Sequence, residues 1–133
     1  LADGEVVRLG GLALASHATP GHAPGGTSWT WRSCEGTRCL DIAYVDSHSA
    51  LTDGHYRFSD HPAYVAAFER SLDTVAGLPC DLLITPHPAA SNLLARFNGD
   101  APLVDPGACK AFAVNARANL AARLAEERKE PAP

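Results

Sequence analysis

The sequence predicts an α/β fold, with one mixed β-sheet that carries helices on a single face. Two observations predict it. Strand-like segments dominate the chain before Asp46, and two amphipathic helical patterns follow them, separated by a short apolar run. A sheet with helices on only one face corresponds to half of a four-layer sandwich, so its other face needs something to cover it.

Five segments have the pattern of β-strands. They are residues 5–9, 12–16, 27–32, 40–45 and 82–84. The first two flank Gly10-Gly11, which is a strong hairpin signal because glycine tolerates the turn conformations that such hairpins require. The third alternates threonine with tryptophan, as a strand with two different faces does. The last is a continuous apolar run, which is typical of a buried strand.

Three segments have the pattern of helices. They run from Pro62 to Gly77, from about Ala90 to Phe97, and from Pro106 onward. Pro62 suits a first helical position, because that position needs no backbone N–H. Asp105 is expected to cap the last helix. Arg123 and the charged run 126–130 are expected to form a solvated face of that helix.

Composition and charge narrow the function classes. A chain of 133 residues with 46% hydrophobic and 20% charged residues is long and apolar enough for one globular domain with a core. The net charge of −4, without clustered Lys and Arg, argues against a nucleic-acid-binding surface. No apolar stretch is long enough to predict a membrane span. We expect one structural unit over residues 1–128 and a disordered tail over 129–133.

The amino terminus differs from that of a complete protein. Leu1 is not an initiator methionine, and the residues after it do not form a signal peptide but resemble the entry to a strand. We therefore expect the chain to be a processed or truncated product.

The four cysteines fall into two plausible pairs, Cys34 with Cys39 and Cys80 with Cys109. The first pair brackets a turn-like insert, and the second links the start of a strand to the first turn of the last helix. Because no pair has Cys-x-x-Cys spacing, a structural zinc site or a thioredoxin-type motif is disfavoured. Two disulfides indicate an oxidising compartment, periplasmic or secreted for a bacterial protein. Four reduced core thiols in a cytosolic protein are the alternative.

Two histidines lie among glycines and prolines next to predicted strands. His22 precedes the strand at 27–32, and His87 follows the apolar strand at 82–84. Glycine allows a tight turn and proline stiffens it, so an imidazole can be held there without a helix. Side chains from distant segments converge at strand ends and form ligand sites. The pair predicts metal ligands that only the fold brings together. A turn histidine that caps backbone groups is the alternative for His22.

Three motifs, Gly21-His22-Ala-Pro-Gly, Asp46-Ser47-His-Ser49 and Thr85-Pro86-His87-Pro88, follow one another in the chain. In this order they resemble the carboxyl-terminal half of the metallo-β-lactamases, and of subclass B3 in particular. The resemblance covers nearly the whole chain and implies one half of the αββα sandwich of that family. The two cysteine pairs resemble the disulfides of particular secreted members.

The resemblance implies a role for each motif residue. His22 corresponds to the third histidine of the first zinc site, and His87 to the one ligand that this half gives to the second zinc. Ser47 lies where other subclasses carry a zinc-ligating cysteine, and Ser49 corresponds to a serine that contacts the carboxylate of the bound drug. The alternative for both serines is that they cap a turn. Asp46 is expected to be a turn residue or to support the site from outside.

The remaining zinc ligands of the family, in the motif His-x-His-x-Asp-His, belong to the amino-terminal half and do not occur in this sequence. The other histidines, His17, His48, His55 and His61, do not supply them. The resemblance therefore implies a zinc-dependent enzyme, with two zinc ions per complete protein, in which zinc-bound hydroxide opens the β-lactam ring. This chain alone is expected to be inactive, because one histidine per zinc is too few. The missing half is the expected partner.

Two other functions remain open at this point. The first is another hydrolase of the same fold that acts on thioesters or lactones. The second is a non-catalytic periplasmic module that is stapled by disulfides and has lost its metals. Zinc stoichiometry separates the enzymes from the module.

Overall fold

We describe residues 1–129 of a computed structural model. Within them the strands are β1 (Val6–Leu9), β2 (Leu12–Ala18), β3 (Thr27–Glu35), β4 (Arg38–Tyr44) and β5 (Leu82–Ile84). The helices are α1 (Pro62–Ala76), α2 (Leu93–Phe97) and α3 (Ala108–Glu127), with 3₁₀ turns η1 (Phe58–Asp60) and η2 (Pro88–Ser91). All but the first residue of the predicted disordered tail 129–133 lies outside the described residues.

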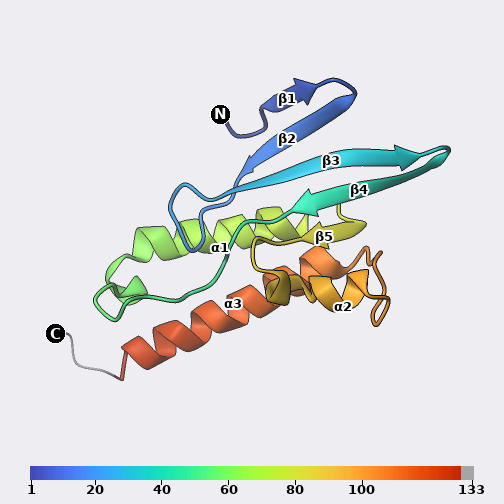
Figure 1. Cartoon of the computed structure of the whole chain (residues 1–133). Coiled ribbons are helices and arrows are strands. Elements are labelled where there is room, and N and C mark those ends of the chain that lie inside the picture. Colours follow the sequence, from blue (N-terminus) through green and yellow to red (C-terminus); the bar gives the residue numbers. More distant parts are fainter. Residues whose placement is uncertain (130–133) are drawn as a thin grey trace.

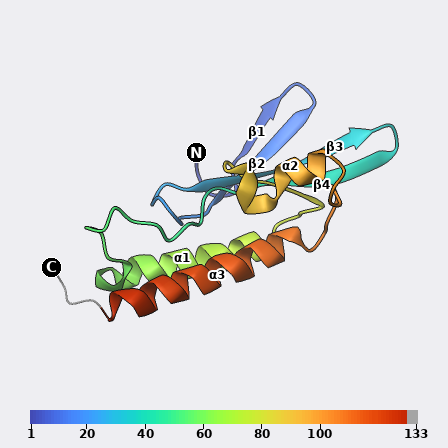
Figure 2. The same ribbon diagram turned by 60° about the horizontal axis from the view of Figure 1, so that its bottom comes forward.

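The strands form one mixed sheet in the order β1-β2-β3-β4-β5. The first four strands are antiparallel neighbours, and β5 runs parallel to β4. The chain crosses from β4 to β5 through α1, as a parallel pair requires. Helices α1 and α3 lie on one side of the sheet (Figure 1) and run side by side beneath it (Figure 2). The predicted mixed sheet with helices on one face is confirmed.

The hydrophobic core lies between the sheet and the helices α1 and α3. Ala43 and Leu83 contribute from neighbouring positions on β4 and β5, and Leu72 of α1 is fully buried beneath them. Leu120 adds the contribution of α3. The apolar spacing of three and four residues in both helices places one face of each against the sheet.

The opposite face of the sheet is apolar, and no helix of residues 1–129 covers it. Six side chains from β1 to β4 line a groove of about 450 Å³: Val7, Leu9, Leu14, Trp29, Trp31 and Tyr44. Within this groove, Leu9 is 75% exposed. Exposed apolar patches of this kind mark interaction surfaces in soluble proteins. This is the face for which the sequence predicts a partner.

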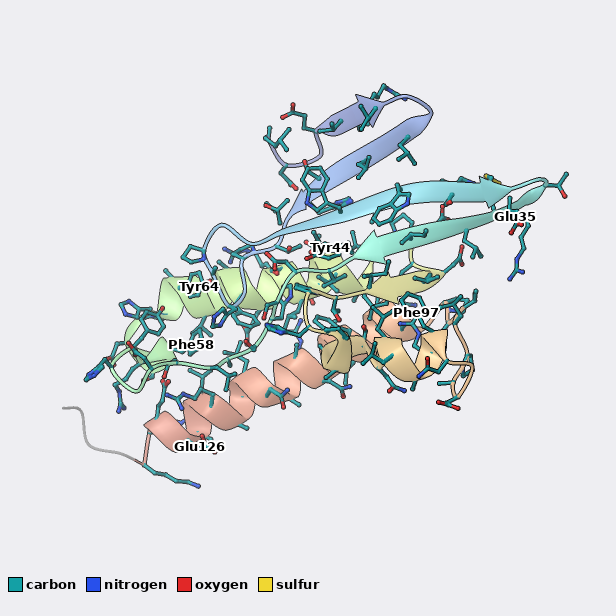
Figure 3. The ribbon with its side chains drawn as sticks, in the orientation of Figure 1. Glu35, Tyr44, Phe58, Tyr64, Phe97 and Glu126 are labelled. Atoms are coloured by element: carbon teal, nitrogen blue, oxygen red, sulfur yellow. A yellow bond between two sulfur atoms is a disulfide. The ribbon has the colours of Figure 1, made fainter. Side chains whose placement is uncertain are left out.

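Both predicted disulfides are present in the structure. Cys34 and Cys39 are cross-strand partners at the tip of the β3–β4 hairpin, where Glu35 lies (Figure 3). This hairpin is longer than predicted, because β3 continues to Glu35 instead of ending at Arg32. Cys80 joins the segment before β5 to Cys109 in the first turn of α3.

The helix near residue 90 and the start of α3 differ from prediction. Asn92 adopts a left-handed conformation (φ 52°) and divides the expected single helix into η2 and α2. Asparagine accepts this conformation more readily than most residues. Helix α3 begins at Ala108 with Gly107 as its N-cap, whereas Asp105 accepts a hydrogen bond from the Gly107 N–H instead of capping the helix.

The prediction of a solvated face at the end of α3 is wrong for Glu127, which is only 1% exposed. Its carboxylate accepts hydrogen bonds from the backbone N–H groups of Phe58 and Ser59 and from the side chain of Arg123. Figure 3 shows Phe58 at the end of the molecule where α3 finishes. Glu127 therefore connects the end of α3 to η1 through hydrogen bonds. Arg123, which was also predicted to be solvated, is half-buried.

Replacing Glu127 with glutamine is expected to lower the free energy of unfolding by about 1–3 kcal/mol near neutral pH, because buried donors lose a charged acceptor. Burial alone raises the pKa of Glu127, but hydrogen bonds from Ser59, Arg123 and Phe58 outweigh it and lower that pKa. A lowered folded-state pKa stabilises the fold above the unfolded carboxyl pKa of about 4.3, and this contribution is lost as pH falls through the folded value. Urea unfolding at several pH values tests this, and the two proteins should converge in acid. An equal difference at every pH would contradict it.

Candidate metal centre

Three loops meet at one edge of the sheet. β4 and β5 run in the same direction, so the segments that follow them, residues 45–51 and 85–88, leave the sheet at the same edge (Figure 1). The loop at 19–26 joins them, because Trp29 near the start of β3 is the cross-strand partner of Tyr44 at the end of β4. A hydrogen bond from the His22 N–H to the Ser47 carbonyl (3.0 Å) ties the first loop to the second.

The loop that carries His22 is compact. The N–H of Thr19 donates to the Gly26 carbonyl, and a Cβ atom at Gly26 would lie 2.5 Å from the Thr19 carbonyl oxygen. Only glycine fits this close approach. The Tyr64 hydroxyl donates to the Gly21 carbonyl (2.6 Å), and Figure 3 shows Tyr64 near the start of α1. The loop is therefore fastened to a helix as well as to the sheet.

The imidazole of His22 is exposed, and its Nδ1 atom contacts Ser49. Its Nδ1 lies 3.3 Å from the Ser49 carbonyl oxygen and 3.3 Å from the Ser49 hydroxyl oxygen. A carbonyl only accepts, so Nδ1 carries the hydrogen in that contact and Nε2 keeps its lone pair. Metal-binding histidines commonly use this arrangement, in which a backbone carbonyl fixes the tautomer. The geometry of His22 thus fits a zinc ligand.

The two serines lie side by side after β4. Their hydroxyl oxygens are 3.3 Å apart, and both side chains are half-buried. The Asp46 carboxylate accepts hydrogen bonds from the backbone N–H groups of Ser47 (2.7 Å) and Thr27 (3.2 Å). Asp46 is therefore a loop-organising residue, and its hydrogen bonds fix the serine segment against the start of β3.

His87 follows β5 and is exposed between Pro86 and Pro88. The Thr85 hydroxyl donates to the His87 carbonyl (2.8 Å) and also lies 2.8 Å from the Ser91 hydroxyl. The backbone around the imidazole is thus fixed from both sides.

A buried arginine supports the same loop, and sequence reasoning did not find it. Arg96 is 8% exposed, and its guanidinium donates to the carbonyls of Leu83 (2.7 Å), Ser91 (3.2 Å) and Leu103 (2.7 Å). A charge that is buried without a carboxylate needs such hydrogen bonds. Nothing in the sequence pattern distinguishes Arg96 from a solvated helix residue, because its acceptors are backbone atoms of other segments.

The candidate residues share one region of the surface. Ser47, Ser49 and His87 line a cavity of about 420 Å³, which extends to Asn115 and Asn119 of α3. His22 lines a neighbouring cavity of about 300 Å³, and Leu51 borders both. The structure therefore brings His22 into contact with Ser49, and places Ser49 and His87 around the same cavity.

The described residues provide only part of a metal site. Within residues 1–129, no three His, Cys, Asp or Glu side chains form a group that could hold a metal ion. His22 and His87 each offer one imidazole. Catalytic zinc normally takes three protein ligands. Any tight site at this edge therefore requires ligands from outside these residues.

The other histidines have different surroundings. His17 contacts the Thr30 hydroxyl oxygen (2.8 Å), and burial lowers its pKa although the charge of Asp3 opposes this effect. His61 is stacked on a tyrosine ring, and His55 is exposed. His48 is 3% exposed, and burial lowers its pKa despite a hydrogen bond to the Asp46 carbonyl.

Comparison with known proteins identifies the fold and its relatives. No family model matches the sequence. The metallo-β-lactamase MIM-1 from Novosphingobium pentaromativorans superimposes with a TM-score of 0.93 at 50% sequence identity, over 99% of this chain and 49% of that one. SMB-1, a metallo-β-lactamase crystallised with 2-mercaptoethanesulfonate, is 45% identical (TM-score 0.91, 96% of this chain and 51% of that one).

MEM-A1, a subclass B3 metallo-β-lactamase from a soil metagenome library, is 40% identical, with a TM-score of 0.91 over 98% of this chain and 53% of that one. The chain spans about half the length of each of these proteins. In sequence and in fold it is therefore related to the subclass B3 metallo-β-lactamases, and it corresponds to one half of their domain, consistent with the carboxyl-terminal half.

Proposed function

We propose that this chain forms one half of a zinc-dependent β-lactam hydrolase, in which His22 binds one zinc ion and His87 binds a second. The observation that carries the proposal is the convergence of the two histidine loops on Ser49, in a chain that is 50% identical to half of a metallo-β-lactamase. Zinc in such a site lowers the pKa of a bound water to about 7 and polarises the carbonyl of the substrate.

The residues of this chain hold and orient the reacting groups. The Ser49 carbonyl accepts a hydrogen bond from Nδ1 of His22, which would leave Nε2 available to bind a metal ion. Ser47 and Ser49 line the same cavity as His87, and the Ser49 hydroxyl would donate a hydrogen bond to the carboxylate of the drug. The Ser47 hydroxyl, 3.3 Å from that of Ser49, would form hydrogen bonds near the site. Neither serine is a nucleophile, because hydrolysis by activated water needs no covalent intermediate on the protein.

The remaining ligands come from the half of the domain that this chain does not span. That half covers the apolar face of β1 to β4, where Trp29 and Trp31 are accessible. Its own histidines and aspartate complete both zinc sites. Two disulfides, which persist in oxidising compartments, support a location in the periplasm or outside the cell.

The test compares the chain alone with a chimera, in which the half of MIM-1 that the chain does not match is fused to this chain. We expect the chimera to bind about two zinc ions and to hydrolyse nitrocefin, a chromogenic cephalosporin. We expect the isolated chain to show neither, because one ligand per metal is too few for tight binding. Zinc is measured by elemental analysis and hydrolysis by absorbance.

Each outcome discriminates between functions. Hydrolysis by the isolated chain would contradict its role as half of a site. A folded chimera that binds zinc and cleaves thioesters or lactones but not β-lactams would favour the other hydrolases of this fold. A folded chimera without zinc would favour a non-catalytic module.

A further inference from the structure

The buried His48 occupies an unusual position between the two site serines. Ser47, His48 and Ser49 all border the cavity that His87 lines, but His48 is only 3% exposed. Nδ1 lies 2.9 Å from the Asp46 carbonyl oxygen, and Nε2 lies 2.6 Å from the Ser71 hydroxyl oxygen on α1. Because a carbonyl only accepts, Nδ1 donates to it and the neutral ring accepts the Ser71 hydroxyl hydrogen at Nε2.

Both long helices contact this ring. Phe68 of α1 and Phe112 of α3 approach it edge to face, with centroid distances of 5.5 Å and 5.8 Å. Such pairs are favourable beyond the apolar area that they bury. The His48 ring is therefore fixed by two hydrogen bonds and by two aromatic side chains from separate elements.

The loop that carries the candidate ligand His22 also packs against the His48 ring. A Cβ atom at Gly21 would lie 2.8 Å from Cδ2 of His48 and 2.7 Å from the Ser47 carbonyl oxygen. The next residue, His22, donates its N–H to that same carbonyl oxygen and contacts Ser49 through its ring. A shift of His48 would thus move both the serine segment and the backbone that carries His22.

We propose that His48 is a positioning residue. Its buried imidazole fixes the positions of His22, Ser47 and Ser49 relative to His87. The expected effect on catalysis rests on the proposed function. The expected effect on the positions of the loops rests only on the contacts described above. Displacement of a reacting group by about 1 Å can lower a rate by about 100-fold. Outer residues that orient metal ligands typically contribute about 10–100-fold.

Two variants test the positioning role of His48, and a third serves as a control for loss of stability. His48→Leu removes both hydrogen bonds but keeps an apolar side chain, and Ser71→Ala removes only the partner of Nε2. Val75→Ala shortens a fully buried side chain of α1 that lies outside the candidate site. It is expected to lower the unfolding midpoint without moving the loops.

In the chimera, His48→Leu is expected to lower kcat for nitrocefin about 10–100-fold, and Ser71→Ala less, with the protein folded in both cases. Val75→Ala should change kcat by less than about threefold at a similar or greater loss of stability. If kcat is unchanged in the folded His48→Leu variant, or follows stability equally in all three variants, His48 has no positioning role.

A second measurement does not depend on activity. In the isolated chain, the amide signals of Ser47 and Ser49 and the ring nitrogen signals of His22 are recorded by NMR. We expect His48→Leu and Ser71→Ala to shift or broaden them, and Val75→Ala to leave them in place. Unchanged signals would overturn the inference even if the chimera is active. Altered signals with an inactive wild-type chimera would preserve the positioning role and refute the proposed function.

Discussion

Alanine at His22 or at His87 is expected to lower β-lactam hydrolysis by the chimera at least about 100-fold, because the loss of a direct ligand should exceed the 10–100-fold cost of losing an outer one. Under the proposed function, each substitution removes one of the two imidazoles that we assign to zinc. The residual site keeps too few ligands to hold zinc tightly or to orient a water molecule. We expect zinc content to fall from about two ions to about one in each variant. Nitrocefin hydrolysis and elemental analysis on the same samples test both expectations.

His55→Ala is the matched control, because it also removes an exposed histidine but one that lines neither cavity. It should retain hydrolysis within about twofold and its full zinc content. The double variant His22→Ala/His87→Ala separates two sites from one. Loss of both zinc ions only in the double variant supports one histidine per metal. Full activity in either single variant would contradict the ligand assignment.

Local pattern was sufficient for most of the architecture. The Gly10-Gly11 hairpin, the apolar β5 and the start of α1 at Pro62 all follow from signals within a few residues. The placement of the His22 and His87 loops beside neighbouring cavities is not a local property. It was predictable only because ligands gather at strand ends and because the motifs resemble those of a family.

Residues whose partners are backbone atoms of distant segments could not be predicted in this way. Glu127 lies among charged residues and has the local pattern of a solvated helix end, yet its acceptor atoms bind η1 from far along the chain. Arg96 is likewise buried, and the backbone carbonyls that accept its hydrogen bonds are not identified by any sequence pattern. The contact of His48 with Ser71 also joins residues far apart in the chain, and no local pattern indicates it. A polar residue looks the same in a sequence whether its partner is water or backbone.

Removal of the Cys80–Cys109 disulfide by double substitution with alanine is expected to lower the free energy of unfolding by about 3–4 kcal/mol. The bond closes a loop with a sequence separation of 29, and the entropy that it removes from the unfolded chain grows with the logarithm of loop length. Cys109 is also 1% exposed within the core. A loss of this size is a large part of the stability of a small domain. Urea unfolding of the isolated chain measures it.

The second disulfide is the internal comparison. Cys34 and Cys39 have a sequence separation of only 5 at an exposed hairpin tip, so removal of their disulfide should cost about 2 kcal/mol or less. The order of the two effects is therefore fixed by loop length and burial together. The longer loop also contains β5 and His87, so loss of its disulfide should loosen the edge of the sheet that carries the candidate metal ligands, whereas the hairpin tip lies far from that edge (Figure 3). Equal losses of stability in the two variants would show that closure of the long loop is not the source of the stabilisation.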